Sequence, residues 1–335
     1  MDSQAKWPVI GHDWAVDFLR RTLAQGRNRH AYLISGSPSL GKMKLALAFA
    51  QALNCEAESK AQRPCLVCRS CKAIGRGNDP DLIVAAAEDG APLKIDAIRN
   101  VARLLALKPY SSRYRIAILD DFHLVAPLAQ DALLKTLEEP PGHAILLLLA
   151  ASAERVLPTI RSRAQQLPLR PAPLELIRRH LISTGCDEDQ ADLLARLSGG
   201  RVGWALSASA DDSPLEFRNE MLDTLSSVVE GKRLQRMKES DKLSRRAGKD
   251  KALLRSVLEI WQTYWRDVLL QCYDSPVKPC NSDRRDQIRA LAVRLQPSEA
   301  LAALAATGRT LQALDTNANL RLALDALFLD YPGLE

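Results

Sequence analysis

Short apolar runs alternate with amphipathic segments through the first half of the chain. Four runs are nearly continuous in apolar character: 29–36, 81–87, 114–121 and 143–151. Four further segments repeat their apolar residues at helical spacing: 13–24, 42–54, 93–108 and 128–141, the last ended by Pro140 and Pro141. Apolar strands that alternate with helices are typical of a parallel sheet covered on both faces, so we predict an α/β fold.

The second half of the chain lacks a strand pattern. Segments 174–185 and 188–200 indicate short helices that end at glycines, and we predict that they form a small helical lid. A polar break at 208–214 precedes a region that is helical throughout. Its longest helix, at about 250–272, carries one apolar stripe, which is more typical of a helical-bundle core than of a ligand site. The stripe comprises Leu254, Val257, Leu258, Trp261, Trp265, Val268 and Leu269.

These patterns predict three domains, an α/β core at 1–170, a helical lid at 171–210 and an all-α domain at 211–335. The 335 residues are 47% hydrophobic, mostly Ala and Leu, and only 5% aromatic, which favours a helix-rich globular protein. The net charge of +6 suits a protein near nucleic acid and an ordinary basic enzyme equally well. No apolar run approaches the roughly 20 residues that span a bilayer, and the start lacks a signal-peptide core, so we expect a cytoplasmic protein without membrane contact.

The stretch GSPSLGKMKL has the spacing of a phosphate-binding loop, G-x-x-x-x-G-K, between a predicted strand and a predicted helix. In such loops backbone N–H groups and a helix N-terminus converge on phosphates, a lysine adds a point charge, and a hydroxyl holds magnesium. Gly36, Gly41 and Lys42 supply the first two parts. Met43 stands where the hydroxyl is expected, and a thioether is a poor ligand for a hard cation.

A second element of a nucleotide site follows the third predicted strand. Asp120 lies at its end, where a carboxylate can reach magnesium directly or through water, and Asp121 stands where a water-positioning glutamate is usual. The missing methylene displaces the carboxylate by about 1 Å, which can cost about a hundredfold in rate. We expect no productive hydrolysis. Weak nucleotide binding stays open, and so does the alternative that Lys42 and Asp120 only stabilise the loop.

Four of the seven cysteines crowd into one segment with the spacing C-x9-C-x2-C-x2-C. They are Cys55, Cys65, Cys68 and Cys71. Four thiolates close a tetrahedral zinc site with no open position, which is the form of a structural site. The alternatives are a disulfide cluster, which a reducing compartment disfavours, and a chance spacing, which the density of the cysteines disfavours. We predict one structural zinc ion in a module at about 55–71.

With these motifs, the chain resembles the delta-prime subunits of bacterial DNA polymerase III clamp loaders, a branch of the AAA+ family. The resemblance is carried by VIGHDWAVDFL, HAYLISGSPSLGK, the cysteine insert, DPDL, LKIDAIRNV, YRIAILDDFH, DALLKTLEEPP and VLPTIRSRAQ, with a weaker echo in LQALDTNANLRLALDALFL. It implies an AAA+ core, a helical lid and a helical collar that oligomerises. It also implies a hetero-pentameric ring with motor (gamma/tau) and delta subunits, which loads a sliding clamp on primed DNA and binds ATP between subunits.

The resemblance also assigns a role to an arginine. TIRSRAQ is similar to the family's Ser-Arg-Cys motif, whose arginine reaches the ATP site of the next subunit, so Ser162 and Arg163 map onto it, with Ala164 in place of the cysteine. Such a trans arginine neutralises charge that develops on the transferred phosphoryl group.

Active relatives carry further groups that this chain lacks. Ala151 and Ser152 stand where a Thr or Asn senses the gamma-phosphate, and Gly203 stands where the lid supplies an arginine. The resemblance therefore implies a non-hydrolysing subunit that donates Arg163 to its neighbour. Two alternatives remain at this point, an active ATPase motor subunit of the same loader and a zinc-dependent nucleic-acid-binding protein.

Overall fold

The computed structural model describes residues 5–86, 92–248, 250–314 and 319–333. The chain divides into two compact units, the first comprising Met1–Ile177 with Gly200–Trp204 and the second Arg178–Gly199 with Ala205–Glu335. The predicted boundaries at 170 and 210, and a separate lid between them, stay predictions.

The first unit is built on a parallel sheet of five strands, as the alternating pattern predicts. The strands are β1 (Ala31–Ser35), β2 (Leu82–Ala85), β3 (Arg115–Leu119), β4 (Ala144–Ala150) and β5 (Gln165–Pro168), in the order β2-β3-β4-β1-β5. Tyr32 pairs with Leu147 on one side and with Gln165 on the other, and all neighbouring strands run parallel. The carboxyl ends of β1, β3 and β4 therefore meet at one edge of the sheet.

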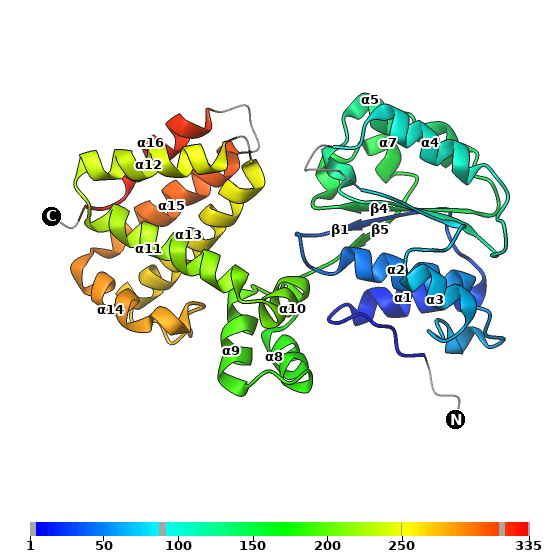
Figure 1. Cartoon of the computed structure of the whole chain (residues 1–335), viewed down its shortest axis with the longest axis horizontal. Helices are drawn as coiled ribbons and strands as arrows, with labels where there is room; N and C mark the ends of the chain where they lie inside the picture. The colour runs from blue at the N-terminus through cyan, green and yellow to red at the C-terminus, as the bar shows by residue number, and fades with distance from the viewer. Residues whose placement is uncertain (1–4, 87–91, 249, 315–318, 334–335) are drawn as a thin grey trace. The chain divides into compact units, whose positions relative to one another are not determined.

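Helices cover both faces of this sheet (Figure 1). The helical segments of this unit are α1 (Asp13–Gln25), α2 (Lys42–Asn54), η1 (Lys60–Gln62), α3 (Arg69–Gly75), α4 (Ile95–Leu105), η2 (Phe122–Leu124), α5 (Pro127–Asp131), α6 (Leu134–Glu138), η3 (Ala153–Arg155) and α7 (Pro158–Arg161). One apolar cluster joins α1 and α2 to the sheet, and a second joins α4, α5 and α7 to its other face. Ile34 faces the first cluster and Leu33 the second, which explains why the strands are apolar on every residue.

Three expectations about this unit need correction. The segment 128–141 is two short helices rather than one, because the amides of Ala132 and Leu133 bond to carbonyls three residues back and tighten the turn between α5 and α6. The strand predicted at 81–87 is shorter, β2 ending at Ala85, and Ala87 lies outside the described residues. The strand β5 was not predicted, because its sequence QQLP has no apolar run.

The second unit is helical, with parts of α8 and α10 shared with the first. Its helical segments are α8 (Leu174–Ser183), α9 (Glu188–Leu197), α10 (Val202–Ala210), α11 (Ser213–Glu230), α12 (Arg233–Ala247), α13 (Lys251–Cys272), η4 (Ser282–Arg284), α14 (Arg285–Arg294), α15 (Pro297–Ala313) and α16 (Leu320–Asp330). The polar break predicted at 208–214 is only two residues long, since α10 continues to Ala210 and α11 begins at Ser213. Ala208 is buried, so burial extends α10 into the polar stretch.

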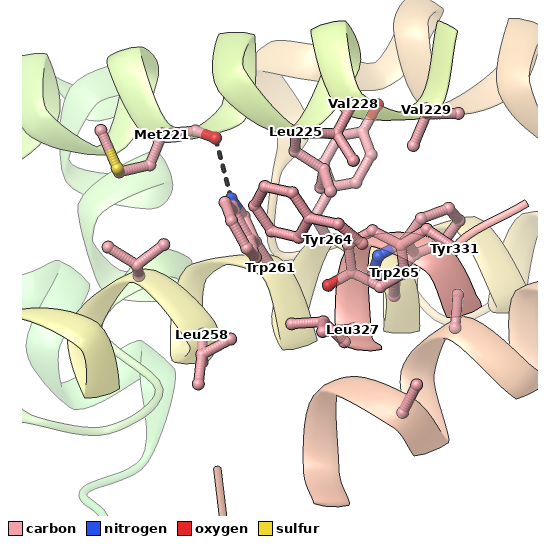
Figure 2. Close-up of a cluster of buried hydrophobic side chains, with 14 of the residues drawn as sticks. Met221, Leu225, Val228, Val229, Leu258, Trp261, Tyr264, Trp265, Leu327 and Tyr331 are labelled. Carbon is pink, nitrogen blue, oxygen red and sulfur yellow. Dashed lines mark hydrogen bonds between the residues drawn. The ribbon is translucent and has the colours of Figure 1, made fainter. Parts of the chain in front are cut away.

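The predicted apolar stripe of α13 forms the core of the helical bundle. Trp261 and Trp265 are fully buried and contact the aromatic rings of Phe328 and Tyr331 from the end of the chain. Figure 2 shows the Trp261 indole N–H donating to the Met221 carbonyl of α11, at 2.8 Å. A buried indole needs such a partner, so this bond fixes how α11 and α13 pack. In the described part of the chain, no helix combines the length and apolar character needed to span a bilayer.

Candidate functional site

The phosphate-loop motif lies between β1 and α2, as predicted. Gly36 follows β1 with φ +149°, and its amide donates to the Ala150 carbonyl at 3.0 Å. Gly41 has φ +98° and is the N-cap residue of α2. A Cβ on Gly36 would lie 2.9 Å from the Leu169 carbonyl, so only glycine fits there. The strand, loop and helix needed for an anion site at a helix N-terminus are therefore present.

Lys42 is buried at the first position of α2. Its Nζ donates to the carbonyls of Gly36 and Ser37, at 2.7 and 3.0 Å, so the amine is bonded to its own loop. Burial lowers the pKa of Lys42, and the nearby carboxylates of Asp120 and Asp121 oppose that shift. The lysine and both acidic residues thus meet at one edge of the sheet, which agrees with their predicted positions.

Met43 turns away from this chemistry. Its side chain is half-buried and packs against the apolar cluster beneath α2. The position that follows the lysine therefore contributes to the hydrophobic core and offers no hydroxyl to a cation.

The two acidic residues sit in a tight turn after β3. The Asp120 amide donates to the Ala85 carbonyl at 2.9 Å, and the Asp120 carboxylate accepts the Asp121 N–H at 2.9 Å. Burial raises the pKa of Asp120, while the Asp121 amide and the Lys42 ammonium oppose this shift. Asp121 is exposed and has φ +47°, a left-handed conformation that aspartate tolerates better than most residues.

His123 belongs to this site, although the sequence analysis assigned it no role. Its Nδ1 accepts the N–H of Ala151 at 3.2 Å, which joins the turn after β3 to the end of β4. Burial lowers the pKa of His123, so the ring is neutral at pH 7, with its proton on Nε2. The only sequence signal was the position of this histidine three residues after Asp120.

The start of α10 reaches the phosphate loop through backbone alone. Gly203 donates its N–H to the Ser39 carbonyl at 2.8 Å, and a Cβ on Gly203 would lie 2.9 Å from the same oxygen. Ser39 has φ +61°. The loop and α10 are therefore too close for a side chain at position 203.

Arg163 and Ser162 lie at the end of α7. Arg163 pairs with Glu138 of α6, with 2.9 Å between Nη2 and Oε1, and its Nη1 donates to the Thr159 carbonyl at 2.9 Å. The Ser162 hydroxyl donates to the same carbonyl at 3.0 Å. The Arg163 side chain is 37% exposed. Among the described residues, neither side chain bonds to the phosphate loop of its own chain.

The four predicted metal ligands come together. The Sγ atoms of Cys55, Cys65, Cys68 and Cys71 all lie within 4.8 Å of one another, and none forms a disulfide. A tetrahedral zinc ion bound at about 2.3 Å would place them about 3.8 Å apart, which is within this limit. The cluster can hold a metal ion, and four sulfur donors suit zinc.

Backbone N–H groups surround these sulfurs. The amides of Cys65, Cys68 and Cys71 donate to the Sγ of Cys55, Cys65 and Cys68 respectively, each at 3.4 Å. Burial raises the pKa of Cys65, but the amides of Val67 and Cys68 and the neighbouring thiols outweigh it and lower the pKa to about 7. At Cys65 these donors stabilise the thiolate form that a metal requires, whereas burial raises the pKa of Cys55 and of Cys71.

The cysteine module is attached to the helix that follows the phosphate loop. Cys55 is the C-cap residue of α2, and Cys71 lies on α3. Gln51 of α2 donates its side-chain amide to the Cys71 carbonyl at 2.8 Å. A metal at this place would connect α3 to the end of α2 opposite the phosphate loop.

The comparisons with known proteins agree with the motifs. Residues 11–173 match the model of a family described as DNA polymerase III, delta subunit. The DNA polymerase III subunit gamma/tau of Mycobacterium bovis is 35% identical over 181 residues, which cover 54% of this chain and 31% of the relative. The DNA polymerase III subunit tau of Escherichia coli is 35% identical over 205 residues, which cover 59% and 31%. The chain thus spans about a third of the length of these curated relatives.

Among solved structures, a DNA polymerase III gamma subunit-related protein from Thermotoga maritima aligns with 94% of this chain and 97% of its own. Its identity is 15% and the TM-score is 0.39. The family match covers the segment that holds the phosphate loop, the cysteine module and Arg163. Over residues 11–173 the chain is similar to the DNA polymerase III delta-subunit family, which confirms the resemblance to clamp-loader subunits that its motifs predict.

Proposed function

We propose that this chain is a non-hydrolysing, delta-prime-like subunit of a cytoplasmic clamp loader. In this proposal it completes a hetero-pentameric ring with motor (gamma/tau) and delta subunits, and the ring places a sliding clamp on primed DNA. Its own pocket is silent. Its chemical contribution is Arg163, which enters the ATP site of the neighbouring subunit.

The observation that carries the proposal is the place of Met43. A magnesium-binding hydroxyl is expected directly after Lys42, and the side chain found there is apolar and packs into the core. Without that ligand a metal ion lacks a fixed position beside the phosphates, and both metal-assisted positioning and charge neutralisation are weakened.

The other parts of the pocket support the same conclusion. Asp121 is a methylene shorter than the glutamate expected at a water-positioning site. Ala151 has no hydroxyl or amide and instead donates its backbone N–H to His123. At Gly203 the helix approaches the loop so closely that an arginine there would displace Ser39. The defects lie on four separate segments, so a single substitution would not restore hydrolysis.

The setting of Arg163 suits a group that acts outside its own chain. Glu138, its partner, is 51% exposed, and an ion pair between two solvent-exposed side chains contributes only about 0–1 kcal/mol. The Arg163 side chain can therefore leave Glu138 at little cost in free energy and bind the phosphoryl group of ATP in the neighbouring subunit. An arginine supplied in trans contributes about a thousandfold or more to phosphoryl-transfer rates.

Zinc has a structural role in this proposal. Four thiolates leave no coordination position for substrate or water, so the ion would act as a staple between α2 and α3.

The test is reconstitution of the loader with the Arg163→Ala variant. We expect ring assembly to be unchanged and DNA-stimulated ATP hydrolysis to fall by about a thousandfold at the site that this subunit contacts. Arg170→Ala is the matched control, because Arg170 is also exposed and lies a few residues away. An unchanged rate with Arg163→Ala would refute the finger assignment. Metal-dependent ATP turnover by the isolated chain would instead favour a motor subunit.

A further inference from the structure

The turn between Cys65 and Cys68 presents two large apolar side chains to solvent. Leu66 is 39% exposed and Val67 is 69% exposed. Neither side chain belongs to an apolar cluster of the unit, so the fold gains little from them. We call this pair the tip.

The backbone of the tip is strained in a way that a smaller residue would avoid. Leu66 has φ +62°, the left-handed region that glycine adopts without steric cost. A glycine at this position would remove both the strain and the exposed apolar surface. The Leu66 amide hydrogen-bonds to Cys71, and a glycine could make the same bond, so the turn itself does not require a leucine. A strained side chain that the fold does not require is found mainly where it is presented to a ligand or partner.

The tip is also held in one conformation. Its flanking residues are two of the four clustered cysteines, and the Cys68 amide donates to Cys65 Sγ across the turn at 3.4 Å. An apolar pair fixed in this way loses little conformational freedom when it binds, which favours affinity.

A basic stripe continues from the tip along α3. Arg69, Lys72 and Arg76 are spaced i, i+3 and i+7, so they share one face of the helix and its last turn, and all three are exposed. Cys71 and Ile74, on the other face, are buried. Within the part of the chain that the structure describes, none of the three cations pairs with a carboxylate.

The charge of the whole module has the same sign. Residues 55–78 contain five basic and two acidic residues, a net charge of +3. One of the two acids, Glu56, accepts the Ser70 N–H at the start of α3, at 3.4 Å, and thus caps the helix. The stripe therefore presents uncompensated positive charge beside an apolar anchor.

We propose that the tip and the basic stripe form a docking site for an extended acidic segment of a partner protein. One apolar side chain of that segment covers Leu66 and Val67, and its carboxylates follow Arg69, Lys72 and Arg76. The stripe is about 10 Å long at the rise of an α-helix, which corresponds to three or four residues of extended peptide. This site is independent of the ATP chemistry proposed for Arg163.

A nucleic acid fits this surface less well. Residues 55–78 contain no aromatic side chain, whereas proteins that hold single strands stack bases on aromatic rings. The branched aliphatic side chains of the tip, next to the basic stripe, instead match a peptide with both apolar and acidic residues. Electrostatic complementarity would orient such a peptide, and the apolar contact would hold it.

The experiment is selection of a phage-displayed random heptapeptide library on the zinc-loaded full chain, with counterselection on the Leu66→Gly, Val67→Ser double variant. We expect enriched peptides to combine a large apolar residue with two or more Asp or Glu residues. Binding is then measured by fluorescence anisotropy. Compared with the unmodified chain, an enriched peptide should bind about tenfold more weakly to the double variant Arg69→Glu, Lys72→Glu of the stripe. It should lose a similar amount of affinity for the double variant of the tip. The double variant Lys232→Glu, Lys238→Glu is the matched control. Both lysines are exposed, Lys232 as the N-cap residue of α12 and Lys238 on that helix, and the variant should leave binding unchanged.

Zinc content and melting temperature show whether each variant is folded. If the double variant Arg69→Glu, Lys72→Glu does not fold, the single variant Arg76→Glu, at the far end of the stripe, replaces it in the binding assay. Enriched peptides without acidic residues, or equal binding to all variants, would overturn the proposal. It would also be overturned if fluorescein-labelled oligothymidylate bound more tightly than the peptides and was lost in the same variants.

Discussion

Asp81→Asn tests how the first unit holds the loop that leads into β3. Asp81 is fully buried, and its carboxylate accepts the backbone N–H groups of Tyr110, Ser111 and Ser112 at 2.6, 2.9 and 2.8 Å. Burial alone would raise the pKa of Asp81, but these three N–H groups outweigh burial and lower it. The ionised carboxylate therefore stabilises the folded unit.

The size of the effect follows from counting acceptors. An asparagine has one oxygen in place of two, so at least one of the three amides loses its partner, which costs about 1–3 kcal/mol. The remaining bonds change from charge-assisted to neutral, which costs about 1 kcal/mol more. We expect Asp81→Asn to lower the free energy of unfolding by about 3 kcal/mol at pH 7.

The same carboxylate gives a pH dependence with a definite sign. Because the folded pKa of Asp81 lies below its ordinary value of 3.8, its stabilisation is fully present above that pH. It is lost as the pH falls through the folded pKa. The difference in stability between the wild type and Asp81→Asn should therefore shrink in acid.

The assay is urea unfolding of the full chain, followed by circular dichroism at pH 7 and at acidic pH. Asp79→Asn is the matched control. Burial raises the pKa of Asp79, and its Oδ1 accepts a single N–H, that of Asp81, at 2.9 Å. An amide oxygen can replace that acceptor, so the control should cost much less. Equal losses for the two variants, or a gap that does not shrink in acid, would refute the reasoning.

Three further predictions concern other parts of the chain. Purified protein should contain one zinc ion, as measured by mass spectrometry of the native protein. Cys65→Ser should release this ion, and the control Cys186→Ser should retain it. Retention of zinc in both variants would exclude the proposed ligand set. Arg236 is buried and donates to carbonyls at the ends of α11 and α16. Arg236→Met removes these bonds and should lower the free energy of unfolding by about 3 kcal/mol or more. An unchanged melting temperature would contradict this prediction. Glu138→Gln should change that free energy by less than about 1 kcal/mol, because its pair with Arg163 is exposed, and a larger loss would mean that the arginine is firmly held.

Local patterns predicted those parts of the site that are local in the sequence. The phosphate loop is recognisable because a buried strand, fixed glycines and a helix must follow one another within about twenty residues. The cysteine cluster is recognisable because C-x2-C turns bring two sulfurs together whatever the surrounding fold is. Both features appear in the structure where the spacing places them.

Contacts between distant segments could not be predicted in this way. The bond from Ala151 to His123 exists only because β3 and β4 pair in one register, which brings together residues 28 positions apart. Likewise QQLP has no strand pattern of its own and becomes β5 by pairing with β1. The approach of Gly203 to Ser39 depends on where α10 begins relative to the loop, and no sequence period records that.

The most direct test of the silent pocket is steady-state ATP hydrolysis by the isolated, zinc-loaded chain with magnesium. The account predicts no turnover above the rate without protein, and no further change on Lys42→Ala. Metal-dependent turnover that disappears in Lys42→Ala would contradict it, because the pocket would then be cutting nucleotide without a hydroxyl at position 43.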